Sequence, residues 1–217
     1  MIAVLDLGFG NVASVINMLN KAGISACVGD SKESIASVDG IILPGVGHFD
    51  TCMELVKKDP ELLDLLEKKV LHEKIPFLGI CIGMHMLFDS SAEGSESGLG
   101  WIAGHVKRFS FDDEKIKIPH MGWSELKLEN KGGGLFEGSS ISRFYFVHSY
   151  YAQCENSEEL IATVQYGNKF FAAAVNRGNI YGVQFHPEKS HKFGLQLLTN
   201  FARVVNIYAQ SHSSSTC

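Results

Sequence analysis

The sequence predicts a single α/β domain whose mixed, largely parallel sheet is flanked by helices and carries a nucleophile elbow. Three observations predict this fold. The chain has 217 residues, enough for one large domain that buries its own core. Its first half alternates short apolar runs with helical stretches, which is typical of right-handed βαβ units and a parallel sheet. Its second half, from Gly104 to Phe185, contains one strand pattern after another.

The elements of the first half follow from apolar runs and helix signals. Asn11 to Ala22 is predicted as a helix that Gly23 ends at its C′ position. Asp59-Pro60-Glu61 opens a second helix, with an N-cap and a proline at its first position. Strands are expected at residues 2–6, 24–28, 40–43 and 76–80.

The second half continues with strands, a hairpin and a closing helix. Asn176-Arg177-Gly178-Asn179 is a hairpin signal between two strands. Ser190 is expected to cap a helix with one apolar face, and we expect the polar tail, residues 211–217, to fray. Residues 1–210 are therefore assigned to one domain. Strands are expected at residues 123–128, 143–151, 160–166, 169–175 and 180–185.

The composition excludes several classes of protein. With 45% apolar and 20% charged residues, the chain is an ordinary globular one, and its net charge of −5 argues against a nucleic-acid partner. The longest mostly apolar run, Ile75 to Phe88, is too short and too interrupted to span a membrane. No basic segment precedes Ile2, so no signal peptide is expected, and the scattered cysteines suit a reducing compartment such as the cytoplasm.

The strongest local motif surrounds Cys81. The strand expected at residues 76–80 runs into Gly79-x-Cys81-x-Gly83, the nucleophile-elbow pattern with cysteine in place of serine. A nucleophile on such a tight turn needs neighbours without side chains two positions away on either side. The start of the following helix favours a thiolate, and the Ile82 N–H can face a developing oxyanion. Alone, the pattern fits a buried cysteine in a glycine-rich turn equally well.

A second motif, Gly182-Val-Gln-Phe-His186-Pro187-Glu188, supplies a candidate base. An apolar strand leads to His186, and Pro187 ends the hydrogen-bond ladder there. Glu188 lies two residues further on, where its carboxylate can orient the imidazole as a catalytic triad requires. A lone histidine is usually a core or solvated residue, but this one accompanies an acid and an elbow cysteine, which favours catalysis.

A glycine-containing turn, Pro44-Gly45-Val46-Gly47, directly follows the strand Ile41 to Leu43. By itself it is typical of an ordinary connection between a strand and a helix. Beside a nucleophile elbow, its glycines allow a peptide N–H to turn towards an oxyanion.

These motifs resemble those of the triad (class I) glutamine amidotransferases. The resemblance rests on Gly79-Ile-Cys81-Ile-Gly83-Met and on Phe185-His186-Pro187-Glu188-Lys189-Ser190. Within that family the chain is similar to the glutaminase subunits of imidazole glycerol phosphate synthase, and the resemblance runs from Ile2 to the closing helix. The segments that carry this closer similarity are Pro44-Gly-Val-Gly47, Pro119-His-Met-Gly-Trp123 and Tyr145-Phe-Val-His-Ser-Tyr150.

The resemblance implies a role for individual residues. Cys81 would attack the carboxamide of glutamine, His186 would accept the thiol proton and later protonate the departing ammonia, and Glu188 would orient His186. The oxyanion amides would come from Gly47 and Ile82. The substrate-binding positions would be Gly45, Val46, His85, Glu93, Ser149 and Tyr150. The partner-interface positions would be Trp123, Tyr145 and Lys189.

The resemblance also implies a partner. Ammonia would pass into a separate cyclase subunit with a (β/α)8 barrel, and this heterodimer would make imidazole glycerol phosphate in histidine biosynthesis. No metal or organic cofactor is implied. Two alternatives stay open: the same glutaminase can supply a paralogous synthase that amidates surface sugars, or the chain is a non-catalytic partner of a barrel protein. The intact Cys81, His186 and Glu188 weigh against the second.

His85 departs from the family pattern, in which glutamine is typical four residues after the nucleophile. One helical turn separates it from Cys81, so we expect it on the same helix face, either packed against neighbours or replacing a substrate contact. An ordinary histidine titrates near ~6.5, so glutamine binding is expected to depend on pH between about 6 and 7.5. Leu7 and Ser124 also depart from the pattern. No catalytic role is assigned to the other histidines, including His120 and His148.

Overall fold

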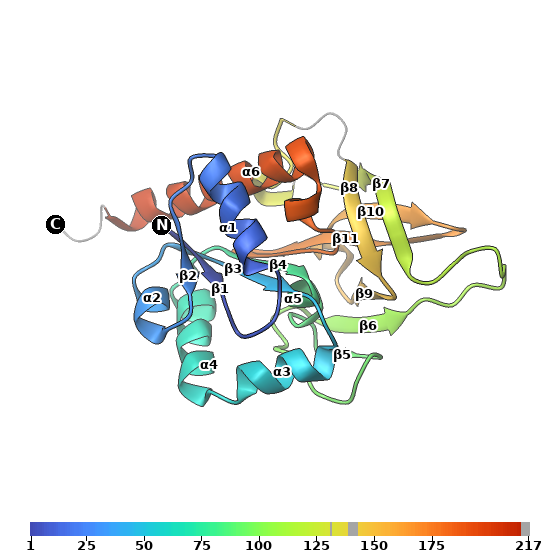
Figure 1. Ribbon diagram of the computed structural model, residues 1–217, viewed down its shortest axis with the longest axis horizontal. Coiled ribbons are helices and arrows are strands. Elements are labelled where there is room, and N and C mark those ends of the chain that lie inside the picture. Colours follow the sequence, from blue (N-terminus) through green and yellow to red (C-terminus); the bar gives the residue numbers. More distant parts are fainter. Residues whose placement is uncertain (131, 139–142, 214–217) are drawn as a thin grey trace.

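The computed structural model describes residues 1–130, 132–138 and 143–213, and its first half alternates strands and helices as predicted (Figure 1). The elements are β1 (Ile2–Leu5), α1 (Val12–Lys21), β2 (Ala26–Gly29), α2 (Lys32–Ala36), β3 (Gly40–Gly45), α3 (Phe49–Lys57), α4 (Pro60–Glu67), the π-helical turn η1 (Lys68–His72), β4 (Phe77–Cys81) and α5 (Ile82–His85).

The second half consists mainly of strands and ends in one long helix. Its elements are β5 (Ser90–Ser91), β6 (Gly104–Arg108), β7 (His120–Leu128), η2 (Gly132–Gly134), β8 (Arg143–His148), β9 (Tyr150–Cys154), η3 (Ser157–Glu159), β10 (Leu160–Tyr166), β11 (Lys169–Arg177), β12 (Ile180–Val183), the single turn η4 (Pro187–Lys189) and α6 (His191–Ser213).

A nine-stranded sheet organises the chain, with the strand order β2-β1-β3-β4-β12-β11-β10-β7-β8. The strands from β2 to β12 in that order pair in parallel, and every neighbouring pair from β12 to β8 is antiparallel. The predicted mixed sheet is therefore confirmed, and its parallel part comprises β2, β1, β3, β4 and β12. A smaller sheet of β5, β6 and β9 lies beside it.

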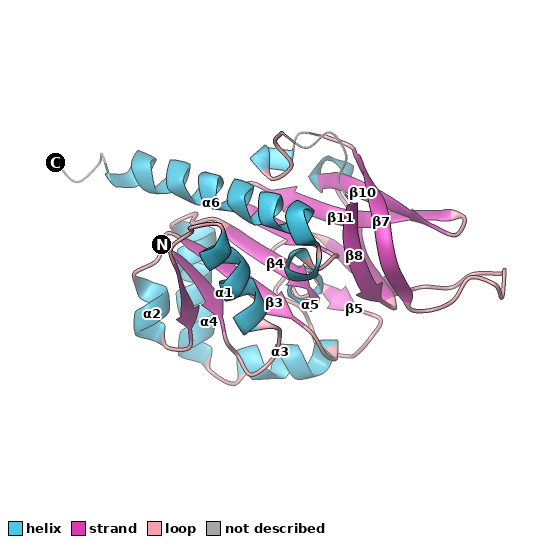
Figure 2. Cartoon of the chain, turned by 45° about the horizontal axis from the view of Figure 1, so that its top comes forward, coloured by secondary structure: helices cyan, strands magenta, loops and turns pink. Residues whose placement is uncertain are grey.

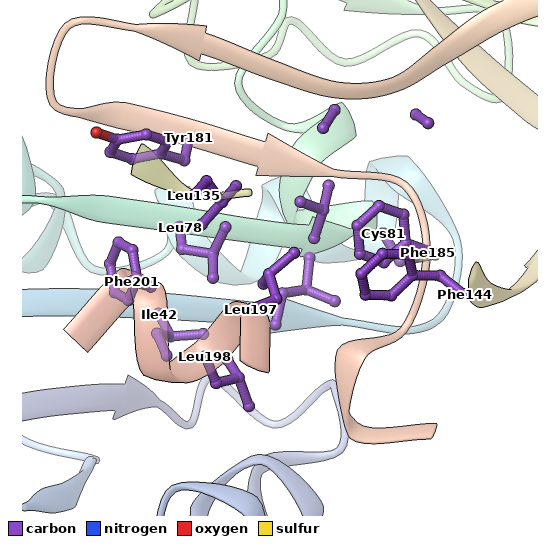
Figure 3. Packing of buried hydrophobic residues seen from close by; sticks show 14 of the residues in the cluster. Ile42, Leu78, Cys81, Leu135, Phe144, Tyr181, Phe185, Leu197, Leu198 and Phe201 are labelled. Atoms are coloured by element: carbon purple, nitrogen blue, oxygen red, sulfur yellow. The ribbon is translucent and has the colours of Figure 1, made fainter. Parts of the chain in front are cut away.

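Helices cover both faces of the parallel half of the sheet: α1 and α6 lie on one face, and α2, α3 and α4 lie on the other (Figures 1 and 2). The side chains of strand β1 explain why both faces are covered, because they alternate between two different hydrophobic cores. Ile2 and Val4 pack with residues of α1 and α6, whereas Ala3 and Leu5 pack with residues of α2, α3 and α4. Figure 3 shows the first core, in which side chains of α6 meet those of β3 and β4.

Local sequence signals position several chain reversals as predicted. The Asp59 side chain accepts the Leu62 N–H at 3.1 Å and caps α4. Gly23 follows α1 with a φ of 70°. Gly178, with a φ of 61°, forms the tight hairpin between β11 and β12, in which Arg177 pairs with Ile180. These three signals are local, which is why the sequence reveals them.

Two expectations need correction. The single strand expected at residues 143–151 is broken at Ser149, because the chain leaves the large sheet after β8 and joins the small sheet as β9. Ser190 precedes α6 as predicted, but its hydroxyl accepts the Tyr145 N–H at 3.0 Å and donates to the His186 carbonyl at 2.6 Å. It is the Ser190 carbonyl that accepts the N–H groups of the first turn of α6.

Helix α6 continues to Ser213, so residues 211–213 are helical, and residues 214–217 of the expected tail lie outside the described residues. Within the described ranges, the helices are all too short or too polar to cross a membrane.

Helix α6 packs closely on the turn that carries His186, and this contact generates a stability prediction. An alanine Cβ at Gly194 would meet the Pro187 carbonyl carbon at 2.6 Å, which forces the helix away from η4. Overpacking of this kind typically costs ~1–3 kcal/mol or more, whereas alanine gains about 1 kcal/mol over glycine in a helix. Because the added Cβ would meet backbone atoms, the upper end of this cost applies, and Gly194→Ala should lower the free energy of unfolding by about 2 kcal/mol or more in urea titrations.

The matched control is Asn206→Ala, on an exposed position of the same helix. It should change the free energy of unfolding by no more than about 0.5 kcal/mol. A Gly194→Ala protein as stable as the control would show that the contact between α6 and η4 is not tight.

Candidate active site

A nucleophile elbow at Cys81 forms the centre of the site, as the sequence predicts. Strand β4 ends at Cys81 and α5 begins at Ile82. Cys81 has a φ of 56° and a ψ of −108°, a conformation that side-chain-bearing residues rarely adopt. Such outliers persist where the surrounding structure holds them, and they cluster at active sites. Helix α5 has only four residues, so the turn is followed by a single helical turn.

Three glycines make the elbow possible by allowing close backbone packing. A Cβ at Gly79 would collide with the Gly83 carbonyl, and one at Gly83 would collide with the Leu43 carbonyl of β3. At Gly45 a Cβ would lie 2.6 Å from the Gly83 nitrogen. Gly45, expected among the substrate contacts, thus packs against the elbow and does not line the cavity.

A cavity of about 280 Å³ opens in front of the elbow. Its wall brings together residues far apart in the chain, and most of them are predicted site residues. Val147 and His148 are additional members that the sequence analysis did not assign. The lining residues are Val46, Gly47, Cys81, Ile82, His85, Glu93, Val147, His148, Ser149, Tyr150 and His186.

His186 and Glu188 form a buried pair. His186 Nδ1 lies 2.8 Å from Glu188 Oε1, and both side chains are only 2% exposed. Glu188 stays off the cavity wall, so it acts on the site through the imidazole ring. His186 Nε2 is buried and has no hydrogen-bond partner among the described residues, which leaves this atom for exchange with the Cys81 thiol or a substrate.

The electrostatics of His186 depend on its two partners. Burial lowers the pKa of His186, but the interactions of the ring with Cys81 and Glu188 outweigh this effect and raise the pKa to about 9. The ring therefore holds a proton at neutral pH beside the sulfur. A positive charge beside the sulfur is the arrangement that activates cysteine nucleophiles.

Glu93 presents a carboxylate to the cavity from the segment that follows β5. Its Oε2 accepts the Phe49 N–H at 3.1 Å, at the first residue of α3. Burial raises the pKa of Glu93, and the hydrogen bond from Phe49 opposes this shift. The start of the helix thus holds one oxygen of a carboxylate that faces the same cavity as Cys81.

His85 lines the cavity, but its expected titration is wrong. The ring is 1% exposed, and Nε2 lies 2.7 Å from Gln184 Oε1. Burial lowers the pKa of His85 to about 4, against the opposing effect of the Gln184 hydrogen bond. The ring is therefore neutral between pH 6 and 7.5, and its protonation cannot make glutamine binding depend on pH in that range.

The sequence analysis missed Gln184. Its side chain is fully buried, and its Nε2 lies 3.9 Å from Cys81 Sγ, within the range of a hydrogen bond to sulfur. A signal was present: Gln184 lies two residues before His186, and side chains at this spacing in extended chain point to the same side.

A second histidine group supports the cavity wall. His148 Nδ1 lies 2.7 Å from the Tyr150 carbonyl, and His148 Nε2 lies 3.1 Å from His120 Nδ1. The other ring nitrogen of His120 lies 3.0 Å from Ser124 Oγ. Burial lowers the pKa of His120 to about 4 and that of His148 well below its usual value. Both rings are neutral, so the network braces the chain at the break between β8 and β9.

The expected interface residues lie close to the catalytic turn. Trp123 and Tyr145 pair across β7 and β8, with ring centroids 6.2 Å apart, and Trp123 stacks on His191 at 5.5 Å. Lys189 is exposed on η4. The His186 N–H donates to the Tyr145 carbonyl at 2.9 Å, so β8 holds the turn that carries His186.

Comparisons with known proteins give a consistent result. The family described as Glutamine amidotransferase class-I matches residues 3–205. "Imidazole glycerol phosphate synthase subunit HisH 2" of Methanococcus maripaludis is 50% identical over 94% of this chain and 99% of its own length. The protein of the same name from Pseudomonas aeruginosa is 46% identical over 94% of this chain and all of its own length.

Solved structures share the fold. A structure described as a glutamine amidotransferase has a TM-score of 0.73 and 21% identity, covering 94% of this chain and 98% of that one. A putative GMP synthase protein from Thermoplasma acidophilum has a TM-score of 0.71 and 19% identity, covering 98% and 96% of the two chains. At this level of identity the likeness concerns the fold alone.

The dependence of His186 on the sulfur is testable. Cys81→Ala removes the interaction with the sulfur that raises the pKa of His186, while the lowering effect of burial remains. The pKa should fall below about 9 in ring-nitrogen NMR titrations. Protonation of wild-type His186 stabilises the fold fully below the unfolded value of ~6.5, and this stabilisation is lost as pH rises through about 9.

The control is Cys27→Ala, on β2, which leaves both partners of His186 in place. It should titrate like the wild-type protein. Equal His186 titration in the Cys81→Ala and wild-type proteins would exclude the coupling.

Proposed function

The chain belongs to the class I glutamine amidotransferases, and from this membership we propose that it is the glutaminase subunit of an imidazole glycerol phosphate synthase. The observation that carries the proposal is the geometry of three side chains. Cys81, which has a positive φ, lines the same cavity as His186. The Nδ1 atom of His186 is hydrogen-bonded to the buried Glu188.

The chemistry follows from these positions. The Cys81 thiolate attacks the carboxamide carbon of glutamine, and the carbonyl electrons move onto oxygen. When the tetrahedral intermediate collapses, the C–N bond breaks and His186 protonates the leaving nitrogen, which departs as ammonia. His186 then removes a proton from a water molecule, and the water oxygen attacks the thioester carbon. The C–S bond breaks, which releases glutamate and restores the Cys81 sulfur. Glu188 keeps the ring oriented and stabilises its charged form.

The cavity wall supplies binding groups for the substrate. We assign the oxyanion to the N–H groups of Gly47 and Ile82, which flank Cys81 on the wall. Gly47 has a φ of 129°, a conformation open to glycine. The Glu93 carboxylate suits the α-ammonium group of glutamine, and Ser149 and Tyr150, where the chain leaves β8, offer further polar contacts on the cavity wall. Val46 completes the pocket beside Gly47.

The destination of the ammonia follows from the relatives. The proteins from M. maripaludis and P. aeruginosa are both named as subunits of imidazole glycerol phosphate synthase, which supports a role in histidine biosynthesis and does not favour sugar amidation. We assign a cyclase subunit with a (β/α)8 barrel as the partner in a heterodimer. Trp123, Tyr145 and Lys189 would meet it on the side of the molecule that holds the catalytic turn.

The role of Cys81 is tested in the assembled synthase. Cys81→Ala should abolish glutamine-dependent product formation, while product formation from added ammonium salt continues, because only the nitrogen source is lost. Product is measured with both nitrogen sources at equal concentrations of the two subunits. Loss of both activities would mean that the substitution damages the complex, and the assignment of the nucleophile would lose its support.

The partner should also control the rate of hydrolysis. Free hydrolysis would waste glutamine, and an incomplete oxyanion site typically lowers kcat by about 10²–10³. We therefore expect weak glutaminase activity in the isolated subunit, rising by at least that order when the cyclase and its ligand bind. Glutamate release is measured with and without the partner. Full activity in the isolated subunit would contradict this control.

A further inference from the structure

A buried carboxamide contacts the sulfur of Cys81. Gln184 follows β12 and is fully buried, and its backbone N–H donates to the Ala173 carbonyl at 2.9 Å. This bond extends the ladder between β12 and β11 and fixes the backbone of Gln184. The side chain then bridges two groups of the cavity wall, with Oε1 2.7 Å from His85 Nε2 and Nε2 3.9 Å from Cys81 Sγ.

The two ends of this carboxamide are not equivalent. Its oxygen accepts hydrogen bonds only, and its nitrogen donates them only. A thiolate can only accept, so it is stabilised when the NH₂ end of Gln184 faces it and is repelled when the oxygen faces it. The orientation of Gln184 therefore bears directly on the charged state of the nucleophile.

His85 decides this orientation. A hydrogen bond to Gln184 Oε1 requires that His85 Nε2 carries a proton, and the carboxamide oxygen is then held away from the sulfur. The ring is neutral because burial lowers the pKa of His85 to about 4, so it has one proton and its Nδ1 is an acceptor. Nδ1 is buried and has no hydrogen-bond partner within the part of the chain that is described. A donor group of a ligand in the cavity would favour the same tautomer.

We propose that Gln184 is a catalytic residue that donates an N–H to the Cys81 thiolate, and that His85 is a positioning residue that holds the Gln184 carboxamide in the donating orientation. The inference rests on the proposed function for the role of Cys81 as the nucleophile. It gives His85 a function distinct from a direct substrate contact: its effect on the sulfur passes through Gln184.

The titratable groups around Cys81 must be considered before a pH profile is interpreted. His186, with Glu188 behind it, contributes hydrogen bonding and charge, and Cys52 of α3 interacts electrostatically with Cys81. The cavity wall adds one carboxylate and two neutral histidines. These last groups are Glu93, His85 and His148. Substitution of Gln184 leaves all of these groups in place. At His85 it removes a hydrogen bond that raises the pKa, so this ring stays neutral and a shift in the profile reports the lost donor.

The test measures how fast iodoacetamide alkylates Cys81 as a function of pH, with mass spectrometry of the Cys81 peptide in the complete chain. Gln184→Met removes the donor and keeps an unbranched side chain of similar length. The midpoint of the profile should rise by about one pH unit, which is about a tenfold loss of alkylation rate below the midpoint. Gln165→Met, the same change at an exposed position, should leave the profile unchanged.

His85 is tested by a double-mutant cycle. His85→Phe removes the ring N–H and should raise the midpoint, whereas His85→Gln keeps a donor and should restore a profile near that of the wild type. In the Gln184→Met background, His85→Phe should add no further shift, because its effect requires the carboxamide. Additive shifts would overturn the positioning role, and an unchanged profile in Gln184→Met would overturn the contact itself.

Folding and function are kept separate in this design. If Gln184→Met melts well below the wild-type protein, Gln184→Leu is measured in the same way, and an unchanged profile there overturns the contact. Alkylation does not require glutamine turnover. A wild-type complex without glutaminase activity would overturn the proposed function, while a shifted Gln184→Met profile would still support the contact with the sulfur.

Discussion

The turn at Cys81 is the constraint on which the rest of the site depends. Cys81 carries a side chain and is nevertheless held at a φ of 56°. The backbone around the turn must therefore pack closely, at positions that have no side chain. Glycines on β3 and β4 meet this requirement. The parallel register then places two further elements. Gly45 pairs with Cys81 across β3 and β4, and Val183 pairs with Ile80 across β4 and β12.

This register explains why the site assembles from distant segments. The turn at residues 45–47 leaves β3 beside the nucleophile, and the segment after β12 brings His186 to its other side. Ligand sites in open α/β sheets lie outside the carboxyl ends of the strands, and here three neighbouring parallel strands end at one cavity. The rings of Phe144 and Phe185 stack beside Cys81 with their centroids 3.9 Å apart, and they cover one side of the turn (Figure 3).

The sequence predicts the parts of the molecule that short-range rules determine. The elbow motif, the Asp59 cap and the hairpin at Gly178 each show within a few residues of sequence, and all three are found. The contact of Gly83 with the Leu43 carbonyl on β3 is a tertiary one that the motif alone does not specify. The break at Ser149 depends on a second sheet that no local pattern specifies. The neutral state of His85 depends on burial by the tertiary fold, and its hydrogen-bond partner Gln184 lies 99 residues away, so no local pattern of residues could indicate either.

Three histidines line one cavity in different states of charge. Burial keeps His85 and His148 neutral, whereas Cys81 and Glu188 keep His186 protonated despite its burial. Environments that push the pKa values of neighbouring groups apart are what assign acid and base roles in active sites. This difference supports the proposed proton-transfer role of His186, the one histidine of the three that is bound to a carboxylate. The other two act as fixed donors and acceptors at the cavity wall.

Hydrogen bonds connect the turn that carries His186 to strand β8. Strand β8 is the last strand in the order of the large sheet. On this strand, both backbone groups of Tyr145 form hydrogen bonds with the segment around η4. Its carbonyl accepts the His186 N–H, and its own N–H donates to Ser190 Oγ. Ser190 in turn donates to the His186 carbonyl, which is why its hydroxyl does not cap α6. These bonds connect β8 to both backbone groups of His186, so the strand at the edge of the large sheet fixes the backbone that carries the imidazole.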